Sequence, residues 1–211
     1  MSDIENQFDD ISDEYIALEQ DDALSSYELN VNWPSLVRLM PEPPATVLDY
    51  GSGGGMYASK MRALNYKVVA ADNSPKMVAA IRDVPAIVWT YGEPLDMEFD
   101  VVMCKLVIQF VDNLEKFARA MRDILNQEGK VIISVPHPDK TRALADEIGV
   151  HASQIGQSEL SVRMIHREQS DYNNAFRAAN FYLQSVDEPR DPADLDAQPK
   201  RLNMVFIKGN V

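Results

Sequence analysis

The stretch Val47-Leu48-Asp49-Tyr50-Gly51-Ser52-Gly53-Gly54-Gly55 decides the fold of this chain. It combines a short apolar strand, an acidic residue and a glycine-rich turn, and a helix is predicted to follow from Met56 to Leu64. Glycine has no Cβ and tolerates positive φ, so a ligand can lie against the bare backbone of such a turn. Free N–H groups at the start of the helix attract carboxylate or phosphate groups. The stretch therefore predicts a site for a nucleoside-like cofactor, with the carboxylate of Asp49 beside it.

A second motif follows at the end of the next predicted strand, Lys67–Asp72. A carboxylate at this place can accept hydrogen bonds from two ribose hydroxyl groups. Ser74 is expected to cap a helix that begins at Pro75, where the missing N–H is not needed. The two motifs together point to a nucleoside cofactor more specifically than either motif alone.

Two cofactor classes use such a layout. Dinucleotide enzymes carry a third glycine that lets the helix pack closely on the strand. Met56 stands at that position here, and Asp49 falls where the dinucleotide fingerprint is normally apolar. The order Asp-x-Gly-x-Gly-x-Gly instead resembles the first motif of class I S-adenosylmethionine (SAM) methyltransferases. An NAD(P)-dependent oxidoreductase is the less favoured alternative.

The resemblance to class I methyltransferases continues along the chain. Four further segments match strands of that family: Ala86–Thr90, Phe99–Leu106, Lys130–Val135 and Leu202–Lys208. Apolar residues from Leu114 to Leu125 recur at helical spacing, and Gly129 is expected to end that helix. The resemblance implies an α/β, Rossmann-like fold: a mostly parallel seven-stranded sheet with helices on both faces and an antiparallel strand near the C-terminus.

The resemblance also implies which residues hold the cofactor. SAM is expected to be the methyl donor and S-adenosylhomocysteine (SAH) the product. Asp49 would lie near the amino group of the cofactor, and Asp72 near its ribose. The residues expected to bind SAM are Asp49, Gly51, Ser52, Gly53, Asp72, Asn73, Met77, Tyr91, Gly92, Glu93, Lys105 and Leu106.

A narrower resemblance covers the second half of the chain. Pro136-His137-Pro138, Ile165-His166-Arg167 and residues 171–181 resemble motifs of one subset of small-molecule methyltransferases. His137 and His166 are therefore candidates for lining the acceptor site or acting as a base, and Arg167 for binding the substrate. A histidine that holds a proline-flanked loop is an equal alternative for His137. A surface salt bridge is the favoured alternative for His166 and Arg167.

Apolar residues at helical spacing also precede the first strand and predict N-terminal helices. In the resembling family such helices lie across the cofactor and help to form the substrate pocket. Tyr15, Tyr27, Asn32 and Trp33 are candidates for touching SAM or the substrate, although packing in the core is favoured for any one of them.

The chain is expected to form a single domain over residues 1–211. Its expected parts are an N-terminal helical cap (1–45), a SAM-binding core (46–135) and a substrate lid with the last strands (136–211).

Composition limits the partners. Twenty Lys and Arg against 33 Asp and Glu leave a net charge of −13, which disfavours binding to nucleic-acid phosphates. No apolar run is long enough to span a membrane, and the acidic N-terminus lacks the pattern of an export signal. The lone Cys104 and the wide spacing of the three histidines predict neither a disulfide nor a metal site. A cytoplasmic location is expected.

The residues and the resemblance together predict SAM-dependent methylation of a small molecule at N or O by in-line displacement. A general base is needed only where the acceptor holds its proton tightly, as an alcohol does. A SAM-binding protein without transferase activity, acting as a sensor or partner subunit, is an open alternative. Neither the acceptor nor an oligomeric state follows from the residues.

Overall fold

A computed structural model describes residues 7–19, 26–146, 149–154 and 161–210 of the protein. Residues 1–6 and 20–25 of the expected N-terminal cap lie outside this description. None of the helices over the described ranges has the length and apolar character needed to cross a bilayer.

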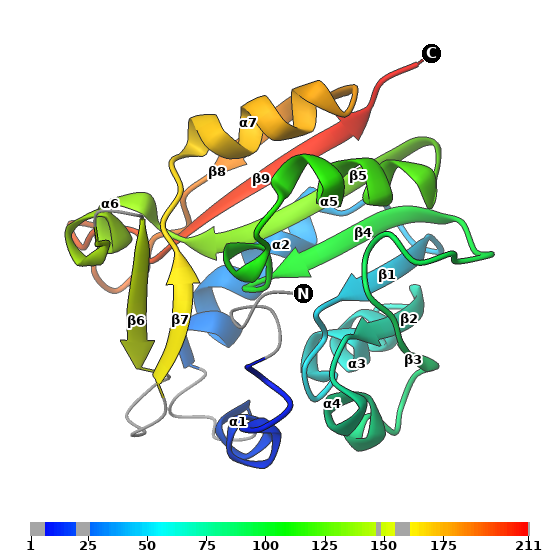
Figure 1. Cartoon of the computed structure of the whole chain (residues 1–211), viewed down its shortest axis with the longest axis horizontal. Helices are drawn as coiled ribbons and strands as arrows, with labels where there is room; N and C mark the ends of the chain where they lie inside the picture. Colours follow the sequence, from blue (N-terminus) through cyan, green and yellow to red (C-terminus); the bar gives the residue numbers. More distant parts are fainter. Residues whose placement is uncertain (1–6, 20–25, 147–148, 155–160, 211) are drawn as a thin grey trace.

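A seven-stranded sheet forms the centre of the molecule, with strand order β3-β2-β1-β4-β5-β9-β8 (Figure 1). Strands β1 to β5 run parallel, and β9 is antiparallel to both of its neighbours, β5 and β8. This confirms the predicted sheet and its reversed strand near the C-terminus. The strands are β1 (Thr46–Tyr50), β2 (Lys67–Asp72), β3 (Ala86–Val88), β4 (Phe99–Lys105), β5 (Leu125–Pro136), β8 (Phe181–Asp187) and β9 (Arg201–Lys208).

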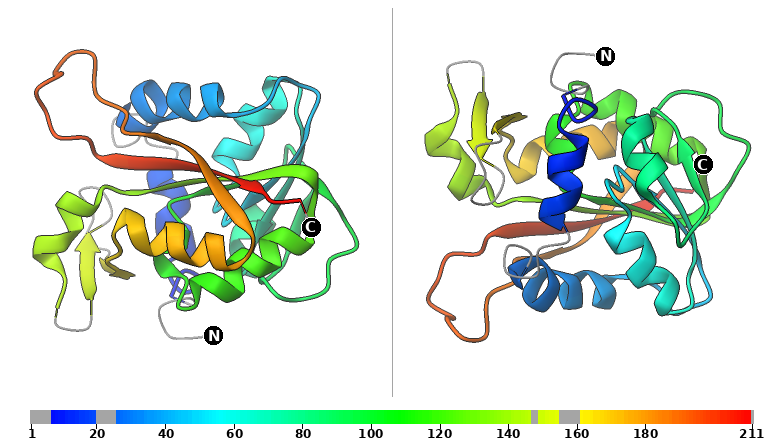
Figure 2. Two further views of the ribbon diagram at one scale, coloured as in Figure 1. Left: turned by 90° about the horizontal axis from the view of Figure 1, so that it is seen from above. Right: turned by 90° about the horizontal axis from the view of Figure 1, so that it is seen from below.

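Helices cover both faces of this sheet (Figure 2). One face carries α2 (Trp33–Leu39) and α3 (Met56–Ala63), and the other carries α5 (Leu114–Asp123) and α7 (Gln169–Ala178). Successive residues of a strand point to opposite faces, so consecutive apolar residues in a central strand serve the two cores in turn. In β1, for example, Val47 packs in the core with α2 and α3, whereas Leu48 packs in the core with α5 and α7.

The boundary between α5 and β5 corrects one sequence expectation. Helix α5 ends at Asp123, and Gly129 lies inside β5 instead of closing the helix. The strand begins early because Leu125 pairs with Phe99 at the start of β4. The N–H of Phe99 also donates to the carbonyl of Ile124 over 2.9 Å. A tertiary pairing therefore ends the helix where the local glycine signal did not.

The remaining elements lie around the carboxyl ends of the parallel strands (Figure 1). Strands β6 and β7 form a separate antiparallel pair. These elements are α1 (Ser12–Glu19), the π-helical turn η1 (Glu28–Asn32), α4 (Pro75–Ala80), η2 (Ile108–Phe110), α6 (Pro138–Thr141), η3 (Arg142–Leu144), β6 (Val150–Gln154) and β7 (Ser161–Ile165).

A buried polar network joins the N-terminal helices to the last strand. Glu28 forms an ion pair with Arg201, and its Oε2 accepts a hydrogen bond from Asn32 over 2.9 Å. The side-chain amide of Asn203 donates to Asn32 Oδ1 and to Ser35 Oγ, each over 3.0 Å. Buried polar groups are costly unless they are paired, so these contacts fix η1 and α2 against β9.

Candidate functional site

The glycine turn after β1 has positive φ at Gly51, Gly53 and Gly55, and neighbouring side chains pack closely against it. The N–H groups of Gly51 and Ser52 both donate to the carbonyl of Ala71, over 2.8 and 3.1 Å, which fixes the turn against β2. Gly51 has a φ of 68°, and a Cβ at this position would meet Val107 Cγ2 at 2.3 Å. Only glycine allows the loop after β4 to approach this closely.

Asp72 connects the glycine turn to the second motif. Its Oδ2 accepts from the N–H of Gly53 and its Oδ1 from the N–H of Ser74, each over 3.0 Å. Burial raises the pKa of this carboxyl group. Ser74 caps α4 as expected, because its hydroxyl accepts from the N–H of Met77 over 3.3 Å. The ends of β1 and β2 are thereby held as one unit around a single carboxylate.

A pocket of about 620 Å³, part of which is open to solvent, lies at the carboxyl ends of β1, β2 and β4. This is the edge at which open α/β sheets bind ligands. Its walls are formed by Phe8, Tyr15, Tyr50, Gly51, Gly53, Asp72, Asn73, Met77, Thr90, Tyr91, Leu106, Val107, Phe110 and Val111.

The pocket brings together many of the residues expected to bind a cofactor. Those in its wall are Gly51, Gly53, Asp72, Asn73, Met77, Tyr91 and Leu106. The other expected residues lie beside or beneath it. Asp49 and Ser52 are buried, and Asp49 Oδ2 and the Ser52 hydroxyl have no hydrogen-bond partner among the described residues. Gly92 lies against Lys116, and Glu93 accepts from the N–H of Thr90 over 3.0 Å.

One wall of the pocket was not expected from the sequence. Phe8 packs edge-on against both Tyr15 and Phe110, with ring centroids 5.5 and 4.8 Å apart. Val107 and Val111 extend this apolar surface. Residues 107–111 directly follow β4, so the rule that ligands bind at carboxyl strand ends could have pointed to them. Phe8 carried no such signal.

Lys105 ends β4 but faces away from this wall into a buried ion pair. Its Nζ lies 3.4 Å from Glu28 Oε2 and 4.6 Å from the centroid of the Tyr57 ring. Burial lowers the pKa of the Lys105 ammonium group, and Glu28 opposes that shift. Burial alone would raise the pKa of Glu28, but Lys105 and Arg201 outweigh it and hold the pKa at about 2.

The pKa values of two further carboxyl groups near the glycine turn are shifted in the opposite direction, upward. Burial, and next the charge of Glu19, raise the pKa of Asp49 from 3.8 to about 7. Burial likewise raises the pKa of Glu19 from 4.5 to about 7, although a hydrogen bond from the N–H of Gly54 opposes the shift. The turn is therefore flanked by acids that ionise only near neutral pH.

These two acids predict how stability depends on pH in the ligand-free protein. Between about pH 4.5 and 7 the folded state binds more protons than the unfolded state, so the free energy of unfolding falls as pH rises. The loss between pH 5 and 8 should be roughly 2–3 kcal/mol for each of the two groups, on the order of 5 kcal/mol in all. Urea unfolding at the two pH values measures it. Asp49→Asn should flatten the dependence, and Asp96→Asn at an exposed site should not. Equal stability at both pH values would contradict the prediction.

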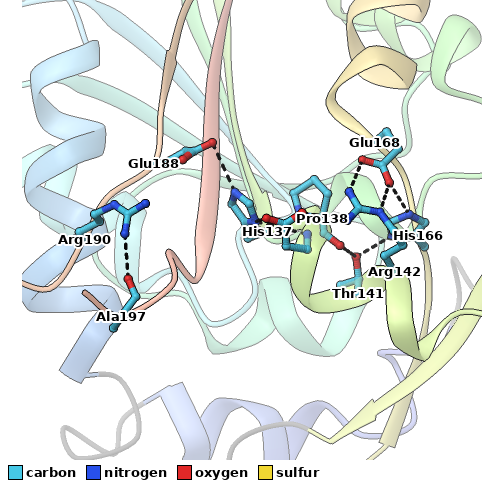
Figure 3. A network of polar contacts seen from close by, with 10 residues as sticks. His137, Pro138, Thr141, Arg142, His166, Glu168, Glu188, Arg190 and Ala197 are labelled. Atoms are coloured by element: carbon cyan, nitrogen blue, oxygen red, sulfur yellow. Dashed lines mark hydrogen bonds and ion pairs between the residues drawn. The ribbon is translucent and has the colours of Figure 1, made fainter. Parts of the chain in front are cut away.

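Neither candidate histidine belongs to the pocket wall formed by the described residues. Figure 3 shows the polar contacts that both make instead. His137 caps α6: its Nδ1 accepts from the N–H of Asp139 over 3.3 Å, and its Nε2 lies 3.4 Å from Glu188 Oε1. His166 Nδ1 lies 2.7 Å from Thr141 Oγ1. Both imidazoles make loop contacts, which agrees with the structural alternatives for His137 and His166, and their role at the acceptor site stays a prediction.

Arg167 supports the pocket wall from behind. Its guanidinium donates to the backbone carbonyls of Ile108 (3.1 Å), Val111 and Asp112 (3.3 Å). Burial lowers the pKa of Arg167. The side chain therefore holds the loop after β4, and a contact of Arg167 with the substrate stays a prediction.

Of the four N-terminal candidates, only Tyr15 lies in the pocket wall. The Tyr27 hydroxyl donates to the carbonyl of Pro189 over 2.7 Å, far along the chain from the glycine turn. Asn32 is fully buried and donates to Glu28 and Ser134. Trp33 packs edge-on against Tyr57, with ring centroids 5.3 Å apart. Asn32 and Trp33 therefore make core contacts, which was the favoured alternative for these residues.

Over the described ranges, no three His, Cys, Asp or Glu side chains are grouped as a metal site would require. Cys104 is buried within β4, and burial raises the pKa of its thiol.

Comparison with known proteins gives one family match. Residues 27–186 match the family described as "Methyltransferase domain". No curated protein matches the sequence significantly.

Several solved structures share the fold. A putative SAM-dependent methyltransferase from Listeria monocytogenes is 20% identical, with 84% of this chain and 98% of that chain covered and a TM-score of 0.68. A putative methyltransferase solved with the Trm112 activator of Haloferax volcanii is 16% identical, with coverages of 99% and 98% and a TM-score of 0.71. The 1,6-didemethyltoxoflavin-N1-methyltransferase of Burkholderia thailandensis, solved with SAH, is 18% identical, with coverages of 94% and 91% and a TM-score of 0.55. At these identities the likeness concerns the fold.

Proposed function

The chain belongs to the class I SAM-dependent methyltransferases, and we propose that it methylates a nitrogen or oxygen atom of a small-molecule acceptor. The observation that carries the proposal is the pocket itself. One side of it is the glycine turn with Asp72, and the other side is the apolar wall of Phe8, Phe110 and their neighbours. A cofactor and an apolar acceptor can therefore lie side by side.

The residues at the turn fit SAM chemically. The buried Asp49 Oδ2 lacks a partner and suits the cationic amino group of the cofactor. Gly51 and Gly53 contribute bare backbone to the pocket wall, against which the methionine part can lie. Asp72 accepts backbone hydrogen bonds from Gly53, Ser74 and Asn73, and because a carboxylate has about four acceptor sites it keeps acceptor capacity for the ribose. Asn73, Met77 and Tyr91 complete the wall on the ribose and adenine side.

Bound SAM supplies a methyl group already activated by its sulfonium. The protein must then align the acceptor behind that methyl group and exclude water. Val107 and Phe110 offer apolar surface for both tasks, and Arg167 fixes their loop through three backbone carbonyls. Burial raises the pKa of the Tyr15 hydroxyl, so Tyr15 does not act as a base near neutral pH.

The charges at the pocket favour particular acceptors. No Lys, Arg or His contributes to the wall formed by the described residues. The stretches outside the described structure contain none of these three residue types either. An anionic acceptor such as a phosphate or carboxylate would therefore find no cation in the wall, and nucleic acid is disfavoured for the same reason. A neutral or cationic small molecule with an apolar body is the acceptor that fits.

The proposal is tested by turnover. The protein and SAM are incubated with amines and phenols that carry aromatic or aliphatic bodies, and methylated products are identified by mass spectrometry. For an acceptor that is turned over, Phe110→Ala should lower kcat/KM about tenfold or more, because roughly 1.5–3 kcal/mol of apolar contact is lost. SAH affinity should change less than twofold.

Leu144→Ala is the matched control, because this apolar side chain is exposed at the surface. Its kcat/KM should equal that of the wild type. An unchanged kcat/KM in Phe110→Ala would remove the apolar wall from the acceptor site. SAH binding without any methylated product across the panel would favour a SAM-binding protein without transferase activity.

A further inference from the structure

We propose that Glu19, at the end of α1, is a second binding carboxylate for the α-ammonium group of SAM, opposite Asp49. The inference rests on the proposed binding of SAM at the glycine turn and adds to it a residue from an N-terminal helix. Class I motifs at the strand ends do not include this position.

The position of Glu19 is fixed by backbone contacts. Its Oε2 accepts the N–H of Gly54 over 2.8 Å. A Cβ built on Gly53 would lie 3.1 Å from Glu19 Oε1 and 3.2 Å from the Tyr15 ring. The carboxylate therefore lies directly on the turn that borders the cofactor pocket, next to a residue of the pocket wall.

Asp49 supplies the independent evidence that this place takes a cation. Its side chain is 3% exposed, and its Oδ2 has no hydrogen-bond partner among the described residues. Glu19 is the charged group that raises the pKa of Asp49 most, after burial itself. The buried Asp49 and the half-buried Glu19 thus share one poorly solvated environment, and such a pair is costly when both ionise without a cation between them.

The nearby protein cation is already engaged. Lys105 favours the ionised forms of both Glu19 and Asp49, but its ammonium group lies 3.4 Å from Glu28 Oε2 and over the ring of Tyr57. Asp72 adds a further negative charge to this environment. The turn therefore has an excess of negative charge, which a ligand cation can balance.

The chemistry of the site selects an ammonium group. An ammonium group has three N–H donors and can bind two carboxylates at once, whereas a sulfonium has no donor. SAM and SAH both carry the α-ammonium group, and only SAM carries the sulfonium. 5′-Methylthioadenosine keeps the adenine, ribose and sulfur but lacks the amino-acid part. Glu19 should therefore contribute to the binding of SAM and SAH alike and not to that of methylthioadenosine.

Calorimetry with Glu19→Gln tests the inference. At pH 7.5 we expect the affinity for SAH to fall about tenfold, while the affinity for methylthioadenosine stays within twofold of the wild type. Glu14→Gln is the matched control, because Glu14 is an exposed residue of the same helix. It should bind both nucleosides as the wild type does.

SAH affinity measured as a function of pH adds a test, because its pH dependence would not change if Glu19 had a purely structural role. Binding of the ammonium group ionises Asp49 and Glu19, so wild-type SAH affinity should rise from pH 6 to pH 8. The rise should be smaller in Glu19→Gln. Lys105, Asp72 and the Gly54 N–H act on Glu19. Glu19, Lys105, Asp72 and the Ala58 N–H act on Asp49.

Several outcomes would overturn the inference. Equal or tighter SAH binding in Glu19→Gln would mean that Glu19 is absent from the ammonium site or competes with the cofactor for the turn. A parallel loss for methylthioadenosine would assign Glu19 a structural role. A wild-type protein that binds neither nucleoside would overturn the cofactor site together with this inference, whereas wild-type binding with an unchanged variant overturns the role of Glu19 alone.

Discussion

Replacement of Asp72 by alanine should weaken SAH binding a hundredfold or more. In the proposed site the carboxylate accepts hydrogen bonds from two ribose hydroxyls, and hydrogen bonds to a charged group contribute about 1.5–3 kcal/mol each. The same oxygens hold the N–H groups of Gly53 and Ser74 at 3.0 Å, so the variant also loosens the turn. The two losses act in the same direction. Calorimetric titration with SAH measures the sum.

A second variant separates the two contributions of Asp72. Asp72→Asn keeps one oxygen acceptor but loses the charge and turns the other acceptor into a donor, so its affinity should fall between those of the wild type and the alanine variant. Asp96→Ala removes an exposed carboxylate and should bind SAH normally. SAH affinity within threefold of the wild type in Asp72→Ala would show that this carboxylate does not bind the cofactor.

The second large effect is expected from Gly51→Ala, in protein stability as well as in cofactor binding. The φ of 68° costs a residue with a side chain about 1–2 kcal/mol. The new Cβ would also meet Val107 Cγ2 at 2.3 Å, and relieving such a contact costs roughly 1–3 kcal/mol. The combined loss of about 2–5 kcal/mol is a large part of the 5–15 kcal/mol typical of a folded domain. Urea unfolding of the ligand-free variant measures it.

Gly149 offers a matched control for the backbone effect. Its φ is 80°, but among the described residues a Cβ there would meet only the carbonyl oxygen of His166, at 3.8 Å. Gly149→Ala should therefore lose about 1–2 kcal/mol of stability and bind SAH as the wild type does. The difference between the two variants isolates the contact with Val107. Equal losses in both would mean that the loop after β4 moves freely away from the turn.

The parts of the fold that follow from local signals were predictable. Strands β1 and β2 are apolar runs that end at an acid, and the cap at Ser74 with Pro75 next to it needs no distant partner. The end of α5 was not predictable in this way. Gly129 is a plausible local stop, but the pairing of Leu125 with Phe99 ends the helix earlier. A signal that depends on a partner strand is invisible in a local window of sequence.

The residues of the candidate site also fall into those that a local motif predicts and those that depend on distant contacts. Asp72, Asn73 and Met77 belong to one contiguous motif at a strand end, so their place in the pocket wall followed from the sequence. Phe8 and Phe110 meet only because two segments far apart in the chain fold together. Arg167 could be recognised as a cation but not as a donor to backbone carbonyls, because carbonyl positions depend on the fold of residues 108–112.

The buried network between Glu28, Asn32, Arg201 and Asn203 bears on how the protein is made. Glu28 and Asn32 lie in η1, early in the chain, yet their polar partners lie in β9, which is translated much later. At about 5–20 residues per second, Glu28 waits roughly 10–30 s for Arg201. During that interval the apolar face of α2 and the edge of β5 lack the strand that covers them, so the nascent chain passes through a period of exposure that ends only after β9 has been made.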